Sequence, residues 1–198
     1  MYWYEDEVRR LERDRLKIAD PDVVFYGSSS IRMWNTLEED FPEIKPVNLG
    51  FGGSTLAACV WFFERIMMYY EPKAIIVYAG DNDLGDGRNS EEIFIFYQML
   101  ATKIANRFGD ELSCYFISIK PSLSRWHMVD RLRYTNNLIE SEIIKCNNNW
   151  KFIDVFKRML DRSGNPEGKY FSQDGLHLST EGYRLWKEVV RSKLCYNH

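Results

Sequence analysis

The chain has 198 residues, of which 45% are hydrophobic and 28% charged, and its formal net charge is −3 at pH 7. This length is ordinary for one domain, here residues 1–198, and the composition is that of a globular protein that needs no disulfide or metal to stabilise its core. The weak acidity argues against a nucleic-acid or anionic-membrane partner, and no apolar run approaches the roughly 20 residues of a membrane span.

Short apolar runs alternate with longer amphipathic stretches in the first half of the chain. In chain order, the expected elements are a helix over 3–18, a strand at 23–26, a turn and short helix to about Leu37, a strand at 47–49, a helix over 55–70 and a strand at 74–78. The run at 74–78 is continuously apolar, as a strand covered on both faces of a sheet should be, and we expect it to lie at the centre of the sheet.

The alternation continues in the second half of the chain. Ser90 is expected to cap a helix that runs to about Phe108, with acidic residues in its first turn, where negative charge suits the helix dipole. The other expected elements are a loop over 80–87, a strand at 113–118, a helix over 127–147, a strand at 152–153, a long loop over 161–176 and a last helix that starts after Ser179-Thr180 and ends near Leu194. About five alternations of strand and helix predict an α/β fold with a five-stranded parallel sheet and helices on both faces.

Polar or glycine-rich segments lie where such a fold places its functional groups, at the carboxyl ends of the strands. Three of them follow expected strands, and a fourth precedes the last helix. They are Gly27-Ser28-Ser29-Ser30, Gly50-Phe51-Gly52-Gly53, Gly80-Asp81-Asn82-Asp83 and Asp174-Gly175-Leu176-His177. Together they offer hydroxyls, bare backbone N–H groups, a side-chain amide, and a carboxylate with an imidazole, which are the parts required for nucleophilic acyl transfer.

Each of these groups answers a chemical need. A serine hydroxyl is a poor nucleophile until a base takes its proton, and His177 suits this task because an imidazole titrates near neutrality. Asp174 lies three residues before His177, close enough to fix the tautomer of the ring. A glycine N–H approaches an oxyanion closely because no Cβ obstructs it, and the Asn82 amide supplies a second donor without charge.

Each motif also has a structural interpretation when it is taken alone. Three adjacent serines after a glycine are usually a turn, a glycine-rich run is usually a tight loop, and Asp174 with His177 is often a surface salt bridge or a helix-capping pair. The interpretation as an enzyme depends on all four segments occurring together, in a compatible order, at the ends of the strands. Spacing alone does not decide which of the three serines would react.

A metal site is the main alternative for the third segment. The carboxylates of Asp81, Asp83 and Asp86 suggest a cation-binding loop, but Gly85 breaks the alternating order of an EF-hand, so we expect no metal. The cysteines are widely spaced and form neither a zinc motif nor a disulfide framework; they are Cys59, Cys114, Cys146 and Cys195. We expect them to be buried free thiols in a cytoplasmic protein, because no signal-peptide pattern is visible.

Other catalytic motifs are missing. The α/β-hydrolase elbow requires a glycine two residues after its serine, and Ile31 stands there if Ser29 is the nucleophile. No phosphate-binding loop of the P-loop or dinucleotide type is present. His127 has no nearby carboxylate before Asp130, and His198 is the terminal residue, so neither is a candidate base.

At these segments the sequence resembles the SGNH (GDSL-type) hydrolases, from about Val23 to Trp186, and in particular the branch of the platelet-activating-factor acetylhydrolase subunits and their bacterial relatives. The matching blocks are Val24-Phe25-Tyr26-Gly27-Ser28-Ser29-Ser30-Ile31, Asn48-Leu49-Gly50-Phe51-Gly52-Gly53-Ser54-Thr55, Gly80-Asp81-Asn82-Asp83 and Asp174-Gly175-Leu176-His177. The resemblance implies a flavodoxin-like, three-layer αβα sandwich and no cofactor.

The resemblance also implies the role of each residue. Ser29 is the nucleophile, Asp174 and His177 form its acid–base pair, and the oxyanion is held by the backbone N–H groups of Ser29 and Gly53 and by the Asn82 amide. The chain departs from the family at two positions. Ser28 replaces the aspartate of the first block and Ser54 that of the second, and neither change removes a catalytic group.

The sequence therefore predicts a carboxylic-ester hydrolase that forms an acyl-enzyme on Ser29. Short loops favour an open site and short acyl chains, such as acetyl on a sugar or a small lipid. The loop 121–126 contributes either to the pocket or, through Arg125, to a surface ion pair. The rivals are an acyltransferase with the same residues and a non-catalytic binding module. The abundant aromatic residues also leave room for a homo-oligomer contact.

Overall fold

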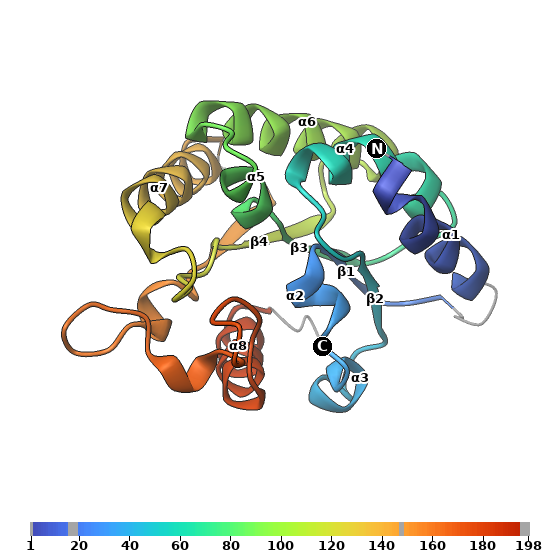
Figure 1. Ribbon diagram of the computed structural model, residues 1–198. Helices are drawn as coiled ribbons and strands as arrows, with labels where there is room; N and C mark the ends of the chain where they lie inside the picture. Colours follow the sequence, from blue (N-terminus) through green and yellow to red (C-terminus); the bar gives the residue numbers. More distant parts are fainter. Residues whose placement is uncertain (1, 16–19, 147–148, 195–198) are drawn as a thin grey trace.

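A five-stranded parallel sheet with helices on both faces forms the centre of the computed structural model, which describes residues 2–15, 20–146 and 149–194 (Figure 1). The strands are Val23–Gly27 (β1), Pro46–Gly50 (β2), Ala74–Tyr78 (β3), Ser113–Ile117 (β4) and Trp150–Ile153 (β5). Their order is β2-β1-β3-β4-β5, so the direction of winding reverses between β1 and β3. The expected five-stranded α/β fold is confirmed, and this reversal is where ligands bind in open parallel sheets.

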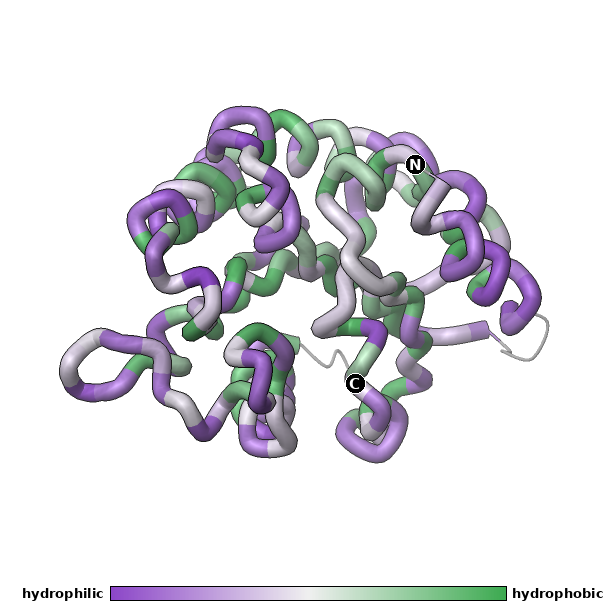
Figure 2. Tube along the Cα trace, viewed as in Figure 1, coloured by the Kyte–Doolittle hydropathy of each residue, from purple (hydrophilic) through white to green (hydrophobic). Residues whose placement is uncertain are grey.

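The helices divide between the two faces of the sheet. On one face lie Glu5–Asp14 (α1), Leu56–Met67 (α4), Ser90–Phe108 (α6) and Val129–Cys146 (α7), and on the other lie Leu37–Asp40 (α3) and Thr180–Lys193 (α8) (Figure 1). Apolar residues concentrate along the strands and the inner sides of these helices (Figure 2). None of the helices in the described parts of the chain is long and apolar enough to cross a membrane.

Successive side chains of a buried strand point to opposite faces of the sheet, so each strand contributes to two hydrophobic cores, one on each face. Val24 and Tyr26 of β1 belong to the cluster under α4 and α6, whereas Val23 and Phe25 belong to the cluster under α8. All five residues of β1 are buried. Because both faces are covered, the strand has no polar side, which is the pattern that the sequence displays.

Several boundaries differ from the sequence-based expectation. The first helix is shorter, because a 3-10 turn at Tyr2–Tyr4 precedes α1 and α1 ends at Asp14; residues 16–19 lie outside the described residues. The expected loop over 80–87 contains a short helix, Asp81–Gly85 (α5). At the expected helix 127–147, α7 begins only at Val129, after a 3-10 turn, and residue 147 is not described.

The expectation that Ser90 caps α6 is wrong. Asn89 is the N-cap: its side chain accepts a hydrogen bond from the Glu92 N–H, and the Glu92 carboxylate accepts one from the Asn89 N–H. This reciprocal capping box satisfies two backbone donors at once, whereas a serine one residue later lies inside the first turn. The expected acidic residues do lie in the first turn of α6, but the cap is one residue earlier than expected.

The cysteines only partly match the expectation. Cys59 and Cys114 are buried free thiols, but Cys146 is exposed at the last residue of α7, so that expectation is wrong for this residue. Cys195 lies outside the described residues.

Asp83 ties the short helix α5 to the start of α4. Its Oδ2 accepts a hydrogen bond from the Leu56 N–H at 2.7 Å, while the Arg88 guanidinium lies 3.8 Å from Oδ1. Burial raises the pKa of this carboxyl to about 6, although the Leu56 hydrogen bond and Arg88 oppose the rise. The folded state therefore holds this proton more tightly than the unfolded chain does.

Replacing Asp83 with asparagine should change how the free energy of unfolding depends on pH. With a folded-state pKa of about 6 against 3.8 in the unfolded chain, the wild-type protein loses stability as pH rises from about 4 to about 6. Each pKa unit corresponds to about 1.4 kcal/mol, so this loss amounts to about 3 kcal/mol and should be missing from Asp83→Asn. Urea unfolding of both proteins across this range measures it, and parallel pH profiles would contradict the prediction.

Candidate active site

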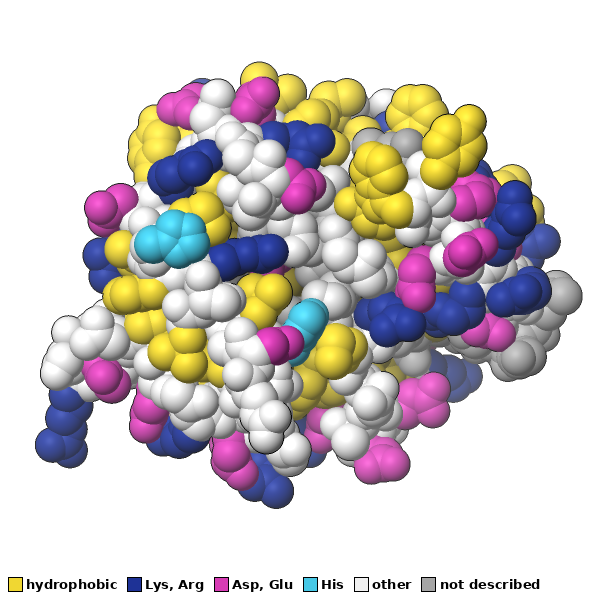
Figure 3. Space-filling model, in the orientation of Figure 1, with side chains coloured by type: hydrophobic (Ala, Val, Ile, Leu, Met, Phe, Trp, Pro, Cys, Tyr) yellow, Lys and Arg dark blue, Asp and Glu magenta, His cyan; other side chains and the backbone are white. Residues whose placement is uncertain are grey.

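The carboxyl ends of three neighbouring strands meet at one place. Gly27 at the end of β1 pairs with Gly50 of β2 on one side and with Tyr78 of β3 on the other. The segments that follow these strands, and the turn before α8, therefore surround one point at this edge of the sheet. Figure 3 shows this face, on which one histidine adjoins an acidic side chain.

The turn from β1 into the short helix Ser29–Arg32 (α2) positions the three adjacent serines. Gly27 has a φ of +143°, and a Cβ there would overlap the Tyr78 carbonyl oxygen. Because no side chain intervenes, the Ser28 N–H donates to that carbonyl at 2.9 Å. Ser28 and Ser30 are buried, and their hydroxyls have no hydrogen-bond partner among the described residues. Only the hydroxyl of Ser29 faces the histidine.

Ser29, His177 and Asp174 form a continuous chain of contacts. The Ser29 Oγ lies 3.2 Å from His177 Nε2, and His177 Nδ1 lies 2.6 Å from Asp174 Oδ2. The Asp174 and His177 side chains keep 49% and 27% of their surface exposed, so the group opens to solvent. The three residues that the sequence places in the acid–base system are thus brought together, across 148 positions of chain.

Asp174 is held in its ionised form by its own turn. The hydrogen bond to the His177 ring, together with those from the Leu176 N–H, the Ser172 hydroxyl and the His177 N–H, holds the pKa of this carboxyl well below its usual range. An ionised carboxylate only accepts hydrogen bonds, so the proton of a neutral His177 ring lies on Nδ1. Nε2 is then a free acceptor for the Ser29 proton.

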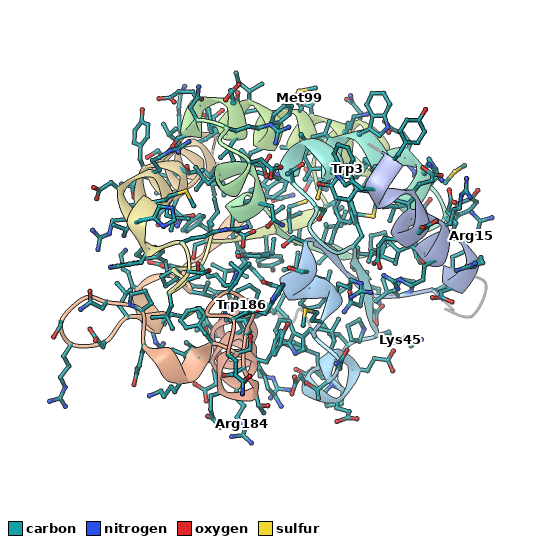
Figure 4. All side chains as sticks on the ribbon, in the orientation of Figure 1. Trp3, Arg15, Lys45, Met99, Arg184 and Trp186 are labelled. Carbon is teal, nitrogen blue, oxygen red and sulfur yellow. The ribbon has the colours of Figure 1, made fainter. Side chains whose placement is uncertain are left out.

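Helix α8 fixes this turn against the sheet. Trp186 lies between α8 and the sheet (Figure 4), and its ring centroid is 4.8 Å from that of Tyr78 on β3. The Ser179 hydroxyl caps α8 by accepting from the Gly182 N–H. The turn that bears His177 therefore has a rigid helix behind it, anchored to the same strand whose carbonyl receives the Ser28 N–H.

The loop after β2 brings Gly53 beside the site. Gly53 has a φ of +70°, which favours glycine, and its carbonyl accepts a hydrogen bond from the Tyr4 hydroxyl at 3.1 Å. Arg10 donates to the Gly50 carbonyl at 3.0 Å. Two side chains from the N-terminal segment thus brace this loop. The sequence analysis missed both, because nothing in an amphipathic helix indicates which loop its polar atoms contact.

Asn82 lies in the first turn of α5 and bridges to the same loop. Its Nδ2 donates to the Ser54 carbonyl at 3.1 Å, and its Oδ1 accepts from Arg125 Nη2 at 3.0 Å. Two of the three donors predicted for the oxyanion, the Asn82 amide and the Gly53 N–H, therefore belong to adjoining segments. The sequence allowed either a pocket role or a surface ion pair for Arg125. The structure shows that its side chain contacts Asn82.

The acidic residues of this loop pair with cations and backbone rather than with one another. Asp81 Oδ2 lies 3.1 Å from both Lys120 Nζ and Arg125 Nη1, and Asp86 pairs with Arg88. Within residues 2–15, 20–146 and 149–194, no group of three histidine, cysteine or acidic side chains is arranged to hold a metal ion. Asp81 thus faces Lys120 and Arg125, whereas Asp83 and Asp86 share Arg88.

Of the two histidines that the sequence argues against as bases, the structure describes only His127. His127 is exposed in the 3-10 turn Trp126–Met128, away from the Asp174 carboxylate that pairs with His177. His198 lies outside the described residues. Lys120 is a residue that sequence reasoning missed; it lies three residues after β4, and its ammonium is buried beside Asp81.

Comparison with known proteins identifies a family match and several structures with the same fold. The GDSL-like Lipase/Acylhydrolase family model matches residues 20–185 of the chain. No curated protein sequence matches it. Among solved structures, a Streptococcus pneumonia protein provisionally described as a platelet activating factor superposes with a TM-score of 0.80 and 19% identity, covering 96% of this chain and 94% of its own.

Two further solved structures have the same fold. A GDSL-like lipase from Bacteroides thetaiotaomicron has a TM-score of 0.78 and 19% identity, covering 93% of this chain and 95% of its own. An acetyl xylan esterase has a TM-score of 0.72 and 19% identity, covering 87% of this chain and 99% of its own. At these identities the likeness concerns the fold.

The Asp174–His177 contact should be visible by NMR without any substrate. The 2.6 Å separation of Nδ1 from an ionised oxygen predicts a strongly downfield ring proton, which low temperature should make observable by slowing its exchange with solvent. Asp174→Asn should abolish this signal, whereas Ser29→Ala should keep it, because the serine contacts only Nε2. A signal that survives Asp174→Asn would show that the ring proton has another partner.

Proposed function

The chain belongs to the GDSL-like lipase/acylhydrolase family, a family of hydrolases, and we propose that it hydrolyses short-chain carboxylic esters through an acyl-enzyme on Ser29. The family match and the structural neighbours confirm the resemblance to SGNH hydrolases and their three-layer fold. The observation that supports the mechanism is the unbroken contact from Ser29 Oγ through the His177 ring to Asp174.

The reaction begins with proton transfer from the serine. As the Ser29 oxygen attacks the ester carbonyl carbon, its proton passes to His177 Nε2, and Asp174 stabilises the resulting imidazolium. The carbonyl oxygen becomes an oxyanion. The backbone N–H groups of Ser29 and Gly53 and the Asn82 amide donate hydrogen bonds to it, which lowers the energy of the tetrahedral intermediate.

The second half of the reaction restores the enzyme. The C–O bond to the alcohol breaks, and His177 gives its proton to the departing oxygen. Water then attacks the acyl-enzyme while Nε2 takes one of its protons, and a second tetrahedral intermediate collapses to release the acid and return the proton to Ser29. No external reductant, oxidant or activated donor is needed to balance these steps.

The surroundings of the site favour a small acyl group. The Asp174 and His177 side chains are partly exposed, and the segments around them are short turns. An open site of this kind buries little of a long acyl chain, and apolar binding scales with buried area. An acetyl group on a sugar or a small lipid fits this site; one structural neighbour is an acetyl xylan esterase.

Substitution of the three serines separates the nucleophile from its neighbours. Ser29→Ala should abolish ester hydrolysis and labelling by a fluorophosphonate, because the attacking oxygen is lost. Ser28→Ala and Ser30→Ala should retain measurable turnover, since their hydroxyls are buried. Activity that persists at the wild-type rate in Ser29→Ala would refute the assignment. A folded wild-type protein that does not label would instead indicate a binding module.

Acyl length should follow the open geometry of the site. Among 4-nitrophenyl esters, turnover of acetate and butyrate should exceed that of chains longer than about eight carbons, because a shallow site removes little apolar surface from water. The same assay with an added acceptor alcohol measures transfer against hydrolysis. A clear preference for long chains would contradict the proposed substrate class, and a transferred acyl group as main product would indicate an acyltransferase.

A further inference from the structure

Arg125 uses both arms of its guanidinium on the segment that carries Asn82. Nη2 donates to Asn82 Oδ1 at 3.0 Å, and Nη1 lies 3.1 Å from Asp81 Oδ2. Only 18% of the side chain is exposed. Gly85 provides the room, because a Cβ at that position would lie 2.9 Å from Nη2. The guanidinium is therefore confined between α5 and its own loop.

These contacts determine which way the Asn82 amide points. An arginine has only donors, so the atom that faces Nη2 must be the oxygen, and the atom that faces the Ser54 carbonyl must be the nitrogen. The reversed amide would place two donors together and two acceptors together. One hydrogen of Nδ2 is used by Ser54, and the other is left to donate to a ligand in the site.

A buried cluster holds Arg125 in place. Lys120 is 2% exposed, and its Nζ lies 3.1 Å from the same Asp81 oxygen that Arg125 contacts. Burial raises the pKa of Asp81, but the charges of Lys120 and Arg125 outweigh that effect and keep its pKa below the usual value. Two cations share one carboxylate, so this cluster carries a net positive charge directly beside Asn82.

The loop that bears Arg125 also reaches the opposite side of the site. The Ser124 N–H donates to the Gly175 carbonyl at 3.1 Å, and a Cβ at Gly175 would lie 3.1 Å from the Leu123 Cβ. Gly175 belongs to the turn between Asp174 and His177. One short loop thus contacts the amide donor through Arg125 and the acid–base turn through its neighbouring residue.

We propose that Arg125 is a positioning residue, which holds the Asn82 amide with a free N–H directed to the oxyanion and polarises that amide through its charge. The proposal rests on the proposed ester hydrolysis, in which Asn82 is a donor. A charged donor on Oδ1 withdraws electron density from the amide, which strengthens the hydrogen bond made by Nδ2. The benefit appears in the transition state, where the negative charge is largest.

A double-mutant cycle tests whether Arg125 acts through Asn82. Asn82→Ala should lower kcat by about 10²–10³, the cost measured for an oxyanion donor in subtilisin, with little change in KM. Arg125→Met should lower kcat about tenfold at nearly constant KM, because a loosened donor is weaker but still present. In the Asn82→Ala background, Arg125→Met should change kcat less than about twofold, since the amide through which it acts is gone.

Arg88 provides a matched control. It is another partly buried arginine whose guanidinium pairs with Asp83 and Asp86 of the same segment, and its side chain contacts those carboxylates rather than Asn82. Arg88→Met should lower the melting temperature without the loss of kcat seen in Arg125→Met. Arg125→Lys keeps the positive charge but has no second arm, so it should recover melting temperature more fully than kcat. An equal loss of kcat from Arg125→Met in both backgrounds would overturn the proposal.

A measurement without catalysis keeps the two proposals separate. The side-chain amide resonances of Asn82, identified by their disappearance in Asn82→Ala, should shift in Arg125→Met and Arg125→Lys but remain in place in Arg88→Met. Unmoved resonances would overturn the positioning role even in an inactive protein. If the wild type neither hydrolyses esters nor labels with a fluorophosphonate, the proposed function fails; if it does both and the cycle is additive, only the role of Arg125 fails.

Discussion

The close approach of Gly27 to the end of β3 is the constraint on which the rest of the candidate site depends. Because position 27 has no side chain, the Ser28 N–H reaches the Tyr78 carbonyl, and α2 starts with the Ser29 hydroxyl directed to His177. Two residues beyond Tyr78, the chain turns into α5, which carries Asn82. The positions of the Ser29 hydroxyl and the Asn82 amide therefore both depend on this backbone anchor, the contact between Ser28 and Tyr78. Any side chain at position 27 would push β1 away from β3 and move the hydroxyl away from the amide.

Three aspartates around this anchor have pKa values set by different causes. Asp174 is half exposed and is kept ionised by hydrogen bonds within its own turn. Asp81 is buried, but two cations at 3.1 Å outweigh its desolvation. Asp83 is also buried, but the Leu56 N–H and a single cation, Arg88 at 3.8 Å, do not offset its desolvation, so its pKa rises. Asp81 thus has one more cation than Asp83, and its cations lie less than 1 Å closer. With these differences Asp81 has a lowered pKa, whereas the pKa of Asp83 is raised to about 6.

The parts that the sequence could predict are those encoded by local pattern. The continuously apolar run 74–78 indicated the central strand, and polar loops after successive strands indicated which residues would meet. Contacts between polar side chains that are far apart in the chain could not be predicted, because they produce no local pattern in the sequence. Nothing around Arg125 distinguishes a surface ion pair from the contact with Asn82, because the difference depends on the room left by Gly85. At Asn89, two adjacent residues with good capping side chains competed, and the pattern that distinguishes them is Glu92, which completes a capping box with Asn89 but not with Ser90.

The contrast between the local Asp174 turn and the distant serine has a consequence for folding. Asp174 orients His177 across three residues, so this pair can form as soon as its own turn does. Ser29 lies 148 residues away and meets the histidine only when α8 packs against β3. Until that packing is complete, the Ser29 hydroxyl has no imidazole beside it to take its proton. Chemical reactivity at Ser29 would then report completion of the tertiary structure, and misfolded copies would carry no stray nucleophile.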